Sequence, residues 1–342
     1  MPDLDAVALR ELERAARSFD YPHAFAGSAV LITGATGFLG SQLAHFFSCL
    51  SKTFGLGVKL QLLVRDESKA RAMFEGRLDI PFSIGANFSD FDSEETNYLF
   101  HCASVTTSRL FVERPVETIH AALFLTDEAL RLARRKNSRM VYLSSMEVFG
   151  KICEDHALKE NEYGYIDILS LRSSYPESKR LCECLCASYA AEYGVDVCIG
   201  RLSQTFGPGI DRGDPRVMAE FCRCVLESRD IVLKTDGASV RSCCCSTDAV
   251  TALAVLACNG RKGEAYNIAN PEMCQSIRET AEFVCSRYPQ VNLRFELDDT
   301  APYPPASRLC LDSSRLEALG WKARTGLREM FELALESMRE AL

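Results

Sequence analysis

Three glycines at regular spacing constrain the fold of this chain more than any other feature. Gly34, Gly37 and Gly40 stand between an apolar, β-forming run at residues 28–33 and a helical pattern at residues 39–50. In such a strand–turn–helix unit the first glycine permits a tight turn, the second lets backbone approach a pyrophosphate, and the third lets the helix pack on the strand. The helix N-terminus then presents free N–H groups to the phosphates. The spacing predicts a dinucleotide-binding turn, with a turn that binds nothing as the alternative.

Strands and helices alternate along the first part of the chain. Strand patterns occur at residues 59–65, 97–103, 140–144 and 195–202, and helical patterns at residues 118–135 and 177–193. This alternation implies right-handed crossovers and predicts an α/β fold with a doubly wound, mainly parallel Rossmann sheet. From about Phe206 the texture changes to loops, short strands and short helices. That change predicts a smaller C-terminal α/β lobe over the carboxyl edge of the sheet, where ligands bind in such folds.

Three segments are predicted for the whole chain. Residues 1–26 form an accessory segment with an amphipathic helical pattern at residues 4–18. Residues 27–203 form the dinucleotide-binding domain. Residues 204–342 form a substrate-binding lobe, from which some strands and helices return to the first domain. The proline-rich stretch 298–307 is expected to be an ordered loop or a short linker.

Charge and hydropathy argue against two classes of partner. The chain has 342 residues, a net charge of −8 and a pI near 5.4, which leaves no basic footprint for nucleic acid. No stretch approaches the roughly 18 consecutive apolar residues of a membrane span. The beginning of the sequence lacks the basic-then-apolar layout of a signal peptide. We therefore expect a cytoplasmic protein that binds neither nucleic acid nor membrane.

Sixteen cysteines raise the question of disulfides and metal sites. Without an export signal we expect a reducing compartment and free thiols. Cys182, Cys184 and Cys186 lie in a helical run, where side chains two residues apart point to nearly opposite faces. Residues 243–245 lie in a strand pattern, where neighbours alternate between faces. Neither group has the paired spacing of a zinc site, so we expect small buried side chains and no metal.

The end of the second strand bears on the choice of cofactor. An acidic residue there binds a ribose 2′-hydroxyl, whereas an arginine accepts a 2′-phosphate. Here the strand ends in Val64-Arg65-Asp66. Arg65 favours NADP, and Asp66 keeps NAD as the alternative after a small shift of register.

A tyrosine and a lysine four residues apart suggest a proton-transfer site. Tyr175 and Lys179 start a helical pattern, so both side chains lie on one face. An ammonium beside a phenol favours the phenolate and is expected to lower the pKa of the tyrosine towards the range of a general base. The hydroxyl of Ser145, at the end of the strand pattern before them, can hydrogen-bond to the same reacting oxygen.

Several separated motifs now point to one family. They are TGATGFLG at 33–40, FHCAS at 100–104, YLSSMEVFG at 142–150, SYPESK at 174–179, RLSQTFGPG at 201–209, GASVRS ending at 242, YNIANP at 266–271 and LEALGW at 316–321. Together they resemble the extended short-chain dehydrogenase/reductases, in the branch of nucleotide-sugar epimerases, dehydratases and decarboxylases. The resemblance implies a catalytic triad of Ser145, Tyr175 and Lys179. In that family the tyrosine takes the proton of the sugar 4-hydroxyl while the cofactor accepts a hydride from C4.

Two further residues bear on the fate of the sugar after its oxidation at C4. Glu147 matches a glutamate of 4,6-dehydratases and UDP-glucuronate decarboxylases, and such a carboxylate can remove the proton at C5. Arg172 resembles the R-x-x-Y arrangement of GDP-mannose dehydratases and UDP-glucuronate decarboxylases. The alternative for Glu147 is a turn residue after a strand. Met146 departs from the pattern, because many dTDP-glucose dehydratases have an acidic aspartate there.

Other positions depart from the family as well. In the helix after FHCAS, this chain has Ala122 in place of the family's asparagine and Leu125-Thr126 in place of its Gly-Thr. Asn87 replaces the adenine-contacting aspartate after the third strand, and Gln204 replaces the asparagine of the R-x-x-N segment. Cys243 and Cys245 replace the aromatic residues that follow the substrate arginine. These changes predict an unusual substrate pocket.

Two arginines of the C-terminal lobe are candidates for the substrate. Arg241 matches a family position that contacts the substrate diphosphate, for which a fixed guanidinium is suited. Its alternative is a surface ion pair. Arg216 is a second candidate. His101 has no partner that the sequence identifies and is expected to be structural, at a strand end beside the cofactor.

These observations define the predicted site. The predicted catalytic residues are Ser145, Tyr175, Lys179 and Glu147. The predicted cofactor contacts are Gly34, Thr36, Gly37, Phe38, Leu39, Gly40, Arg65, Asn87, Phe88, Cys102, Ala103, Ser104, Tyr175 and Lys179. The predicted substrate contacts are Ser104, Arg172, Gln204, Arg216 and Arg241.

The leading hypothesis for function is a nucleotide-sugar 4,6-dehydratase with a tightly bound nicotinamide cofactor. A 4-epimerase or a UDP-glucuronate decarboxylase uses the same first step and is the alternative. A non-catalytic dinucleotide-binding protein is the hypothesis from another class. Relatives commonly pair through two long helices, here residues 118–135 and 177–193, so we expect a homodimer.

Overall fold

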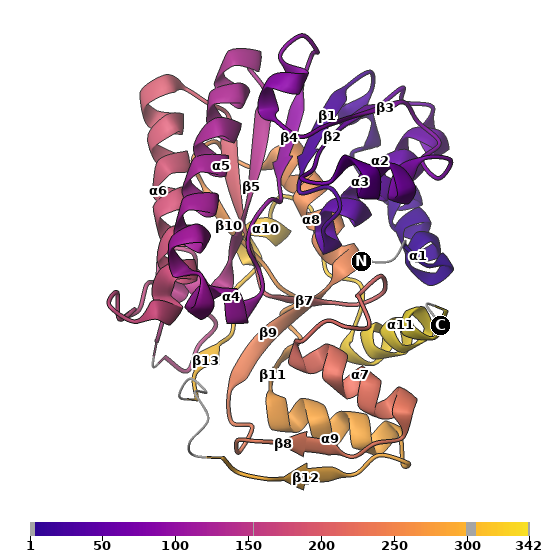
Figure 1. Ribbon diagram of the computed structural model, residues 1–342, viewed down its shortest axis with the longest axis vertical. Coiled ribbons are helices and arrows are strands. Elements are labelled where there is room, and N and C mark those ends of the chain that lie inside the picture. Colours follow the sequence, from indigo (N-terminus) through magenta and orange to yellow (C-terminus); the bar gives the residue numbers. More distant parts are fainter. Residues whose placement is uncertain (1–3, 153, 299–305, 341–342) are drawn as a thin grey trace.

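A parallel sheet forms the centre of the larger lobe (Figure 1). The computed structural model describes residues 4–152, 154–298 and 306–340. In this part of the chain the sheet has seven strands in the order β10-β6-β5-β4-β1-β2-β3, and all neighbours are parallel. The strands are β1 (Ala29–Thr33), β2 (Lys59–Leu63), β3 (Phe82–Gly85), β4 (Tyr98–His101), β5 (Arg139–Ser145), β6 (Val197–Leu202) and β10 (Ala265–Ile268). The predicted doubly wound Rossmann sheet is confirmed.

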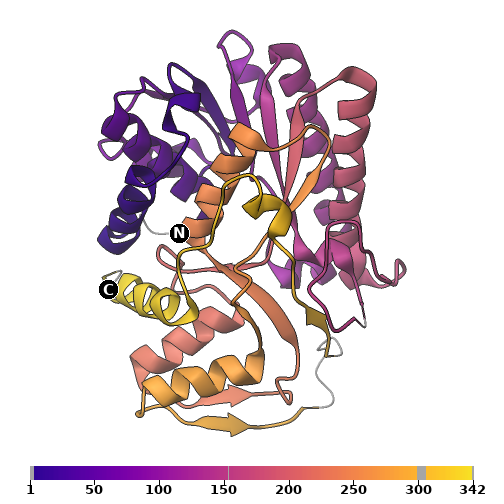
Figure 2. The ribbon, with the colours of Figure 1, turned by 180° about the vertical axis from the view of Figure 1, so that it is seen from behind.

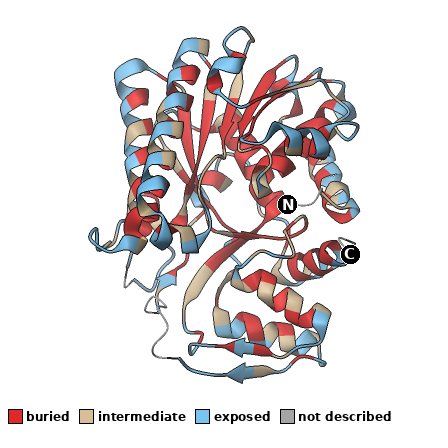
Figure 3. Ribbon diagram, viewed as in Figure 1, coloured by how far each residue is buried: buried red, intermediate tan, exposed pale blue. Residues whose placement is uncertain are grey.

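Helices cover both faces of this sheet. One face carries α1 (Ala6–Arg17), α2 (Phe38–Phe54) and α8 (Ser246–Asn259), and the other carries α5 (Pro115–Lys136) and α6 (Ser174–Tyr193). Figure 2 shows α8 lying across the face opposite α5 and α6. All five residues of β1 are buried, as expected for a strand covered on both faces, and Figure 3 shows the same for the central strands. Because helices cover both faces of the sheet, the sequence of each central strand is a continuous apolar run.

The smaller lobe is built from C-terminal segments. Its helices are α7 (Val217–Glu227), α9 (Ile277–Arg287) and α11 (Leu327–Glu340). Its strands are β7 (Gln204–Phe206), β8 (Ile231–Leu233), β9 (Val240–Cys245), β11 (Cys274–Ser276), β12 (Leu293–Phe295) and β13 (Arg308–Leu309). The strand β9 lies at the centre, paired with β7, β11 and β13. Figure 1 shows this lobe below the carboxyl edge of the large sheet.

Element boundaries differ from the sequence patterns at several places. The strand β3 shows no clear pattern because three of its four residues are only partly buried. The helices α5 and α6 begin at Pro115 and Ser174, ahead of the predicted starts, because proline is tolerated in the first turn of a helix. The predicted stop of α6 at Gly194 is confirmed, with a left-handed φ of 71°. The stretch 298–307 lies largely outside the described residues.

Short elements complete the description. They are α3 (Glu67–Phe74), α4 (Ser108–Glu113), α10 (Ser314–Glu317) and the 3-10 turns η1 (Pro22–Phe25), η2 (Phe88–Phe91), η3 (Met146–Phe149) and η4 (Leu171–Ser173). None of the helices among the described residues is long and apolar enough to cross a membrane.

The N-terminal helix α1 fastens the two lobes together. It packs on α2 and α8 of the large lobe and on α11 of the small one. Asp5 caps it by accepting from Ala8 N at 2.9 Å, and its other carboxylate oxygen accepts from Ser337 Oγ of α11 at 2.6 Å. Arg14 forms an ion pair with Glu329 of α11 at 3.2 Å. The predicted accessory helix is therefore part of the contact between the lobes.

A disulfide corrects the expectation that every thiol is free. Cys274 of β11 and Cys310, just after β13, form a disulfide with a Cα–Cα distance of 5.6 Å. Both strands flank β9, and this placement brings the two residues within the distance that a disulfide requires. Their separation of 36 residues hides this proximity from the sequence. Cys243, Cys244 and Cys245 are free and buried, as expected.

Candidate active site

The glycine turn joins β1 to α2 in a shape that suits a pyrophosphate. Gly34 has a φ of 64°, and a Cβ atom there would lie 2.9 Å from Ala103 Cα. A Cβ atom at Gly40 would lie 2.9 Å from Ala35 Cα, so only glycine lets α2 pack this closely. Gly37 is the N-cap of α2 and supplies no capping side chain. The first N–H groups of the helix are thus available to a bound anion.

The other predicted residues of the turn surround this helix start. Thr36, Phe38 and Leu39 are partly exposed, and Gly37 is exposed. Burying α2 behind the turn while leaving these residues accessible is the arrangement that a ligand on the turn requires. The residues present therefore fit a dinucleotide.

His101 holds the neighbouring strand end in place through a chain of hydrogen bonds. Ala103 N donates to Thr33 Oγ1 at 3.1 Å, and Thr33 Oγ1 lies 2.8 Å from His101 Nδ1. On the other side His101 Nε2 lies 3.2 Å from Thr126 Oγ1, which donates to Ala122 O at 2.7 Å. Because the Thr126 hydroxyl donates to Ala122 O, its oxygen accepts the proton of Nε2, and in the neutral imidazole Nδ1 accepts from the Thr33 hydroxyl. Burial lowers the pKa of His101 to about 3, with the charge of Lys179 as a second cause, in agreement with the neutral form.

These hydrogen bonds give His101 the partners that the sequence did not identify. They link β1, β4 and α5, and they set the path of the predicted cofactor contacts Cys102, Ala103 and Ser104 directly after β4. Cys102 and Ser104 are partly buried beside the turn. Because the bonded residues lie on three separate elements, no local sequence pattern could have predicted these hydrogen bonds.

The ends of β2 and β3 carry the remaining predicted cofactor contacts. Arg65 is exposed just after β2. Asp66 caps α3, because its Oδ1 accepts from Lys69 N at 2.9 Å. Asn87 is exposed after β3, whereas the ring of Phe88 is buried in the core and leaves only its backbone for a ligand. Because β1, β2 and β3 are adjacent and parallel, these ends lie at one edge of the sheet.

The predicted triad comes together between β5 and α6. Ser145 ends β5, and its Oγ accepts from Glu147 N at 3.2 Å and hydrogen-bonds with Tyr175. Tyr175 lies in the first turn of α6 and is 8% exposed. Lys179 is also buried, and its Nζ donates to Leu143 O at 2.7 Å, 5.8 Å from the centre of the Tyr175 ring. The side chains predicted to act together are thus neighbours.

The expected fall in the pKa of Tyr175 is wrong for this arrangement. Burial raises the pKa of Tyr175 well above its ordinary value, and the charge of Glu147 raises it further. The hydrogen bond with Ser145 and the charges of Arg172 and Arg216 oppose the rise. Burial also lowers the pKa of Lys179 to about 8. Desolvation disfavours both charged forms, and sequence spacing alone does not reveal it.

Glu147 and Arg172 form an ion pair beside the triad. Arg172 Nη2 lies 2.8 Å from Glu147 Oε1, with both side chains partly exposed. Arg172 Cζ lies 4.9 Å from the centre of the Phe111 ring, and that ring stacks on Tyr175 with centres 4.2 Å apart and planes 5° apart. Phe111 belongs to α4 and was not predicted for the site, because no motif marks it.

The candidate arginines of the small lobe reach the same region. Arg216 precedes α7, pairs with Asp214 at 2.8 Å and donates to Thr205 O at 3.1 Å. Its charge acts on Tyr175, and its Cζ lies 5.7 Å from the centre of the Phe38 ring in the glycine turn. It thus lies between the turn and the triad.

Arg241 lies on β9 and Gln204 on the paired strand β7. Arg241 donates to Val240 O at 2.8 Å and to Ser307 O and Oγ at 2.5 and 2.8 Å. Neutral oxygens hold it, so the alternative of a surface ion pair finds no support in these bonds. Burial lowers the pKa of Arg241, with Glu147 opposing. Gln204 Oε1 accepts from Cys243 Sγ at 3.7 Å, which places the two departures from the family pattern side by side.

Residues 30–269 match the model of the NAD dependent epimerase/dehydratase family. The chain belongs to that family. It is 26% identical over 316 residues to UDP-glucuronic acid decarboxylase 6 of Arabidopsis thaliana, a match covering 91% of this chain and 88% of the relative. The NAD dependent epimerase/dehydratase family thus accounts for the motifs that joined the sequence to nucleotide-sugar enzymes.

Two solved structures show the same fold. The UDP-glucose 4-epimerase of Thermotoga maritima, solved with UDP-glucose, has a TM-score of 0.77 and 20% identity and covers 92% of this chain and 99% of its own. The dTDP-glucose 4,6-dehydratase of Bacillus anthracis, solved with NAD, has a TM-score of 0.73 and 16% identity and covers 92% of this chain and 97% of its own. The proteins similar to this member of the NAD dependent epimerase/dehydratase family thus have names that describe three different reactions: decarboxylation, 4-epimerisation and 4,6-dehydration.

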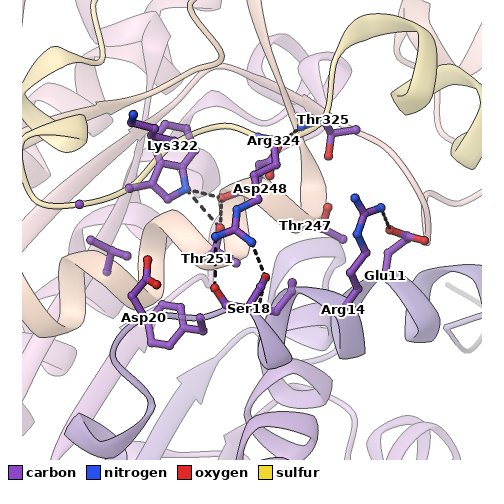
Figure 4. Close-up of a pocket in the computed structure, with 15 residues that line it drawn as sticks. Glu11, Arg14, Ser18, Asp20, Thr247, Asp248, Thr251, Lys322, Arg324 and Thr325 are labelled. Atoms are coloured by element: carbon purple, nitrogen blue, oxygen red, sulfur yellow. Dashed lines mark hydrogen bonds and ion pairs between the residues drawn. The ribbon is translucent and has the colours of Figure 1, made fainter.

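A separate pocket lies away from the predicted residues (Figure 4). It has a volume of about 130 Å³ and is lined by α1, the start of α8 and residues 320–325. Arg324 reaches across it to donate to Ser18 O at 3.1 Å, and Asp248 Oδ2 accepts from Thr325 N at 2.9 Å. These bonds join α1 to the C-terminal segment. Among the described residues no cluster of histidine, cysteine and carboxylate side chains could hold a metal ion.

Proposed function

We propose that this protein oxidises C4 of a nucleoside-diphosphate sugar with a nicotinamide cofactor held on the turn at residues 33–40. The observation that carries this proposal is the convergence of Ser145, Tyr175 and Lys179 beside that turn. Tyr175 takes the proton of the sugar 4-hydroxyl, Ser145 hydrogen-bonds to the same oxygen, and the ammonium of Lys179 favours the phenolate. The cofactor, when bound, accepts the hydride of C4.

Decarboxylation is the outcome that the site supports best. Loss of water requires a proton for the departing hydroxyl, and the position of the aspartate acid of many dTDP-glucose dehydratases holds Met146, which is 8% exposed. Loss of carbon dioxide requires no such proton. The curated relative from Arabidopsis thaliana is a UDP-glucuronic acid decarboxylase. We therefore place a nucleoside-diphosphate uronate ahead of the 4,6-dehydratase substrate that the sequence placed first.

The proposed reaction balances without a further redox partner. Oxidation at C4 makes the uronate a β-keto acid, in which the bond between C5 and the carboxylate carbon breaks. Carbon dioxide leaves, and the electron pair remains as an enolate over C4 and C5. Glu147, oriented by Arg172, delivers to C5 a proton taken from water, which converts the enolate into the 4-keto pentose. Return of the hydride to C4 then yields a nucleoside-diphosphate pentose.

A 4,6-dehydratase remains the second candidate because of Glu147. A carboxylate at this place can remove the C5 proton made acidic by the C4 ketone, which is the first event of water elimination. Incubation with UDP-glucuronate, UDP-glucose, dTDP-glucose and GDP-mannose separates the candidates. A pentose and carbon dioxide support decarboxylation, a 4-keto-6-deoxy sugar supports dehydration, and an epimer supports neither. No turnover of any sugar, with cofactor still bound, contradicts every enzymatic proposal.

We propose NADP as the favoured cofactor and NAD as the alternative. The exposed guanidinium of Arg65 supports NADP, since Asp66 already uses one carboxylate oxygen to cap α3. The Bacillus anthracis neighbour was solved with NAD. The substitution Arg65→Ser tests the choice: affinity for NADP should fall about tenfold, the loss of one charge-assisted hydrogen bond, while affinity for NAD stays unchanged. Equal losses for both cofactors contradict it.

We also propose a homodimer through α5 and α6. The two helices pack on each other and leave the apolar side chains of Ile119, Phe124 and Leu181 exposed. Large apolar side chains exposed on two packed helices suit a contact with a second copy of the same helices. Light scattering after gel filtration should give twice the mass of the 38.0 kDa chain. A monomeric wild type, or a dimer that Phe124→Asp leaves intact, contradicts this arrangement.

A further inference from the structure

Phe111 contacts two of the predicted active-site side chains at once. Its ring is 1% exposed and lies parallel to the ring of Tyr175, with centres 4.2 Å apart. The guanidinium carbon of Arg172 lies 4.9 Å from the centre of the same ring. Arg172 in turn holds Glu147 at 2.8 Å. One aromatic ring therefore connects the predicted base to the ion pair beside it.

The backbone of Phe111 is tied to the start of the same helix that carries Tyr175. Ser174 Oγ of α6 donates to Phe111 O at 2.7 Å, and Ser174 is itself buried. The ring and the carbonyl of Phe111 are thus both fixed against the first turn of α6. A parallel aromatic pair and a cation over a ring each favour one relative orientation of their partners.

We propose that Phe111 is a positioning residue that aligns Tyr175 with the Arg172–Glu147 pair and keeps water from the face of the tyrosine ring. This inference rests on the proposed function, in which Tyr175 is the base and Glu147 handles the C5 proton. In this proposal α4, which carries Phe111, sets the geometry of both proton-transfer groups, Tyr175 and Glu147. A misplacement of about 1 Å in such a group lowers rates by roughly 100-fold.

Besides the Phe111 ring, several ionisable side chains surround Tyr175. They are Glu147 on η3, Arg172 on η4, Arg216 before α7, Lys179 on α6 and Tyr142 on β5. Replacing Phe111 by a smaller side chain removes none of these charges, although it takes the ring away from Arg172. Opening the face of the ring to water reduces the desolvation that raises the pKa of Tyr175. The pKa of Tyr175 should then fall towards its ordinary value. In a plot of the hydride-transfer rate against pH, the acid limb, where the rate rises as Tyr175 loses its proton, should therefore move to lower pH.

The first measurement does not depend on turnover. The full chain is labelled with tyrosine carrying ¹³C at Cζ, saturated with NADP⁺ and titrated between pH 7 and 11, with the Tyr175 resonance assigned by Tyr175→Phe. In the wild type, whose Tyr175 pKa is raised well above its ordinary value, this resonance should stay nearly constant over the range, whereas in Phe111→Ala it should move at the high-pH end. In Phe111→Tyr, which keeps the stacked ring, it should follow the wild type. Coincident behaviour of Phe111→Ala and wild type, including no movement in either, overturns the proposal.

The second measurement follows reduction of NADP⁺ at 340 nm in one turnover with UDP-glucuronate. Phe111→Ala should lower the rate constant about 100-fold and shift the acid limb downwards, while Phe111→Tyr restores both. Phe111→Leu keeps most of the volume and serves if Phe111→Ala does not fold. A wild type that never reduces the cofactor refutes the proposed function, whereas the titration still decides the role of Phe111.

A matched control separates positioning from loss of core packing. Phe25 is fully buried in the hydrophobic core under α2, where its ring lies edge-to-face with Phe47 and tilted against Tyr98, at centre distances of 4.9 and 4.8 Å. Phe25→Ala should cost a comparable amount of stability and leave the Tyr175 titration and the acid limb where they are in the wild type. An equal shift in Phe25→Ala contradicts a specific role for Phe111.

Discussion

Arg172 Nη2 lies 2.8 Å from Glu147 Oε1, and the two side chains come from separate turns, η3 and η4, that both precede Tyr175 in the chain. The pair gives the carboxylate a fixed direction, which a flexible turn residue would lack. Glu147 lies in the turn η3 directly after β5, and its carboxylate in addition pairs with Arg172. Whether this pair delivers a proton to C5 or removes one after oxidation at C4 distinguishes decarboxylation from dehydration.

Replacing Glu147 should divide the reaction into two parts. In Glu147→Gln the triad remains, so UDP-glucuronate should still reduce the bound cofactor. Pentose formation should fall about 100-fold, because general acid–base catalysis at C5 is lost. Cofactor absorbance and product chromatography measure the two parts separately. Glu192→Gln, on the exposed end of α6, is the matched control and should behave as the wild type; equal loss of both parts in Glu147→Gln would refute the assigned role.

Replacing Tyr175 should stop the first step without releasing the cofactor. Tyr175→Phe keeps the stacked ring but removes the hydroxyl, so hydride transfer should fall by about 10²- to 10⁴-fold. The cofactor should still bind, as measured by calorimetry. Tyr189→Phe removes another hydroxyl from α6, one that donates to Asp127 at 2.6 Å, and should keep full activity. Retained activity in Tyr175→Phe contradicts the predicted base.

His101 should make the protein less stable in mild acid. Its pKa is about 3 in the folded chain, against an ordinary value of 6.5, so below pH 6.5 the unfolded chain binds a proton that the folded chain does not. Stability is therefore lost as the pH falls. Between pH 7 and 5 the wild type should lose about 2 kcal/mol more unfolding free energy than His101→Gln, measured in urea. Buried His45, whose pKa is lowered to about 4, is common to both chains and cancels. Parallel pH profiles would show that His101 is not held neutral.

The disulfide between Cys274 and Cys310 should stabilise the small lobe and the position of Arg241. Closing a loop of this length contributes about 2–4 kcal/mol, so Cys274→Ser should lower the free energy of unfolding by that amount. Because Ser307, close to Cys310, accepts two hydrogen bonds from Arg241, the KM for the nucleotide sugar should rise as well. Cys184→Ser, at an exposed free thiol, is the control. An unfolding midpoint that neither Cys274→Ser nor a thiol reductant changes contradicts the bond.

The features that depend on short spacing follow from the amino-acid sequence alone. The turn at Gly34, Gly37 and Gly40, the placement of Tyr175 and Lys179 on one face of a helix, and the parallel sheet all follow from local periodicity. Glycine needs no neighbours to permit a close approach, and side chains four residues apart on a helix meet whatever packs around them. These features, together with the separated motifs, were enough to predict the family.

Which distant side chains meet, and how far they are dehydrated, depends on how the whole chain packs. Phe111 stacks on Tyr175 across 64 positions of the chain, and Thr33 and Thr126 meet His101 from two other elements. The disulfide depends on two strands flanking β9. The pKa of Tyr175 rises instead of falling because burial outweighs the neighbouring charges. Spacing along the chain carries no information on desolvation, since burial is a property of everything that packs around a group.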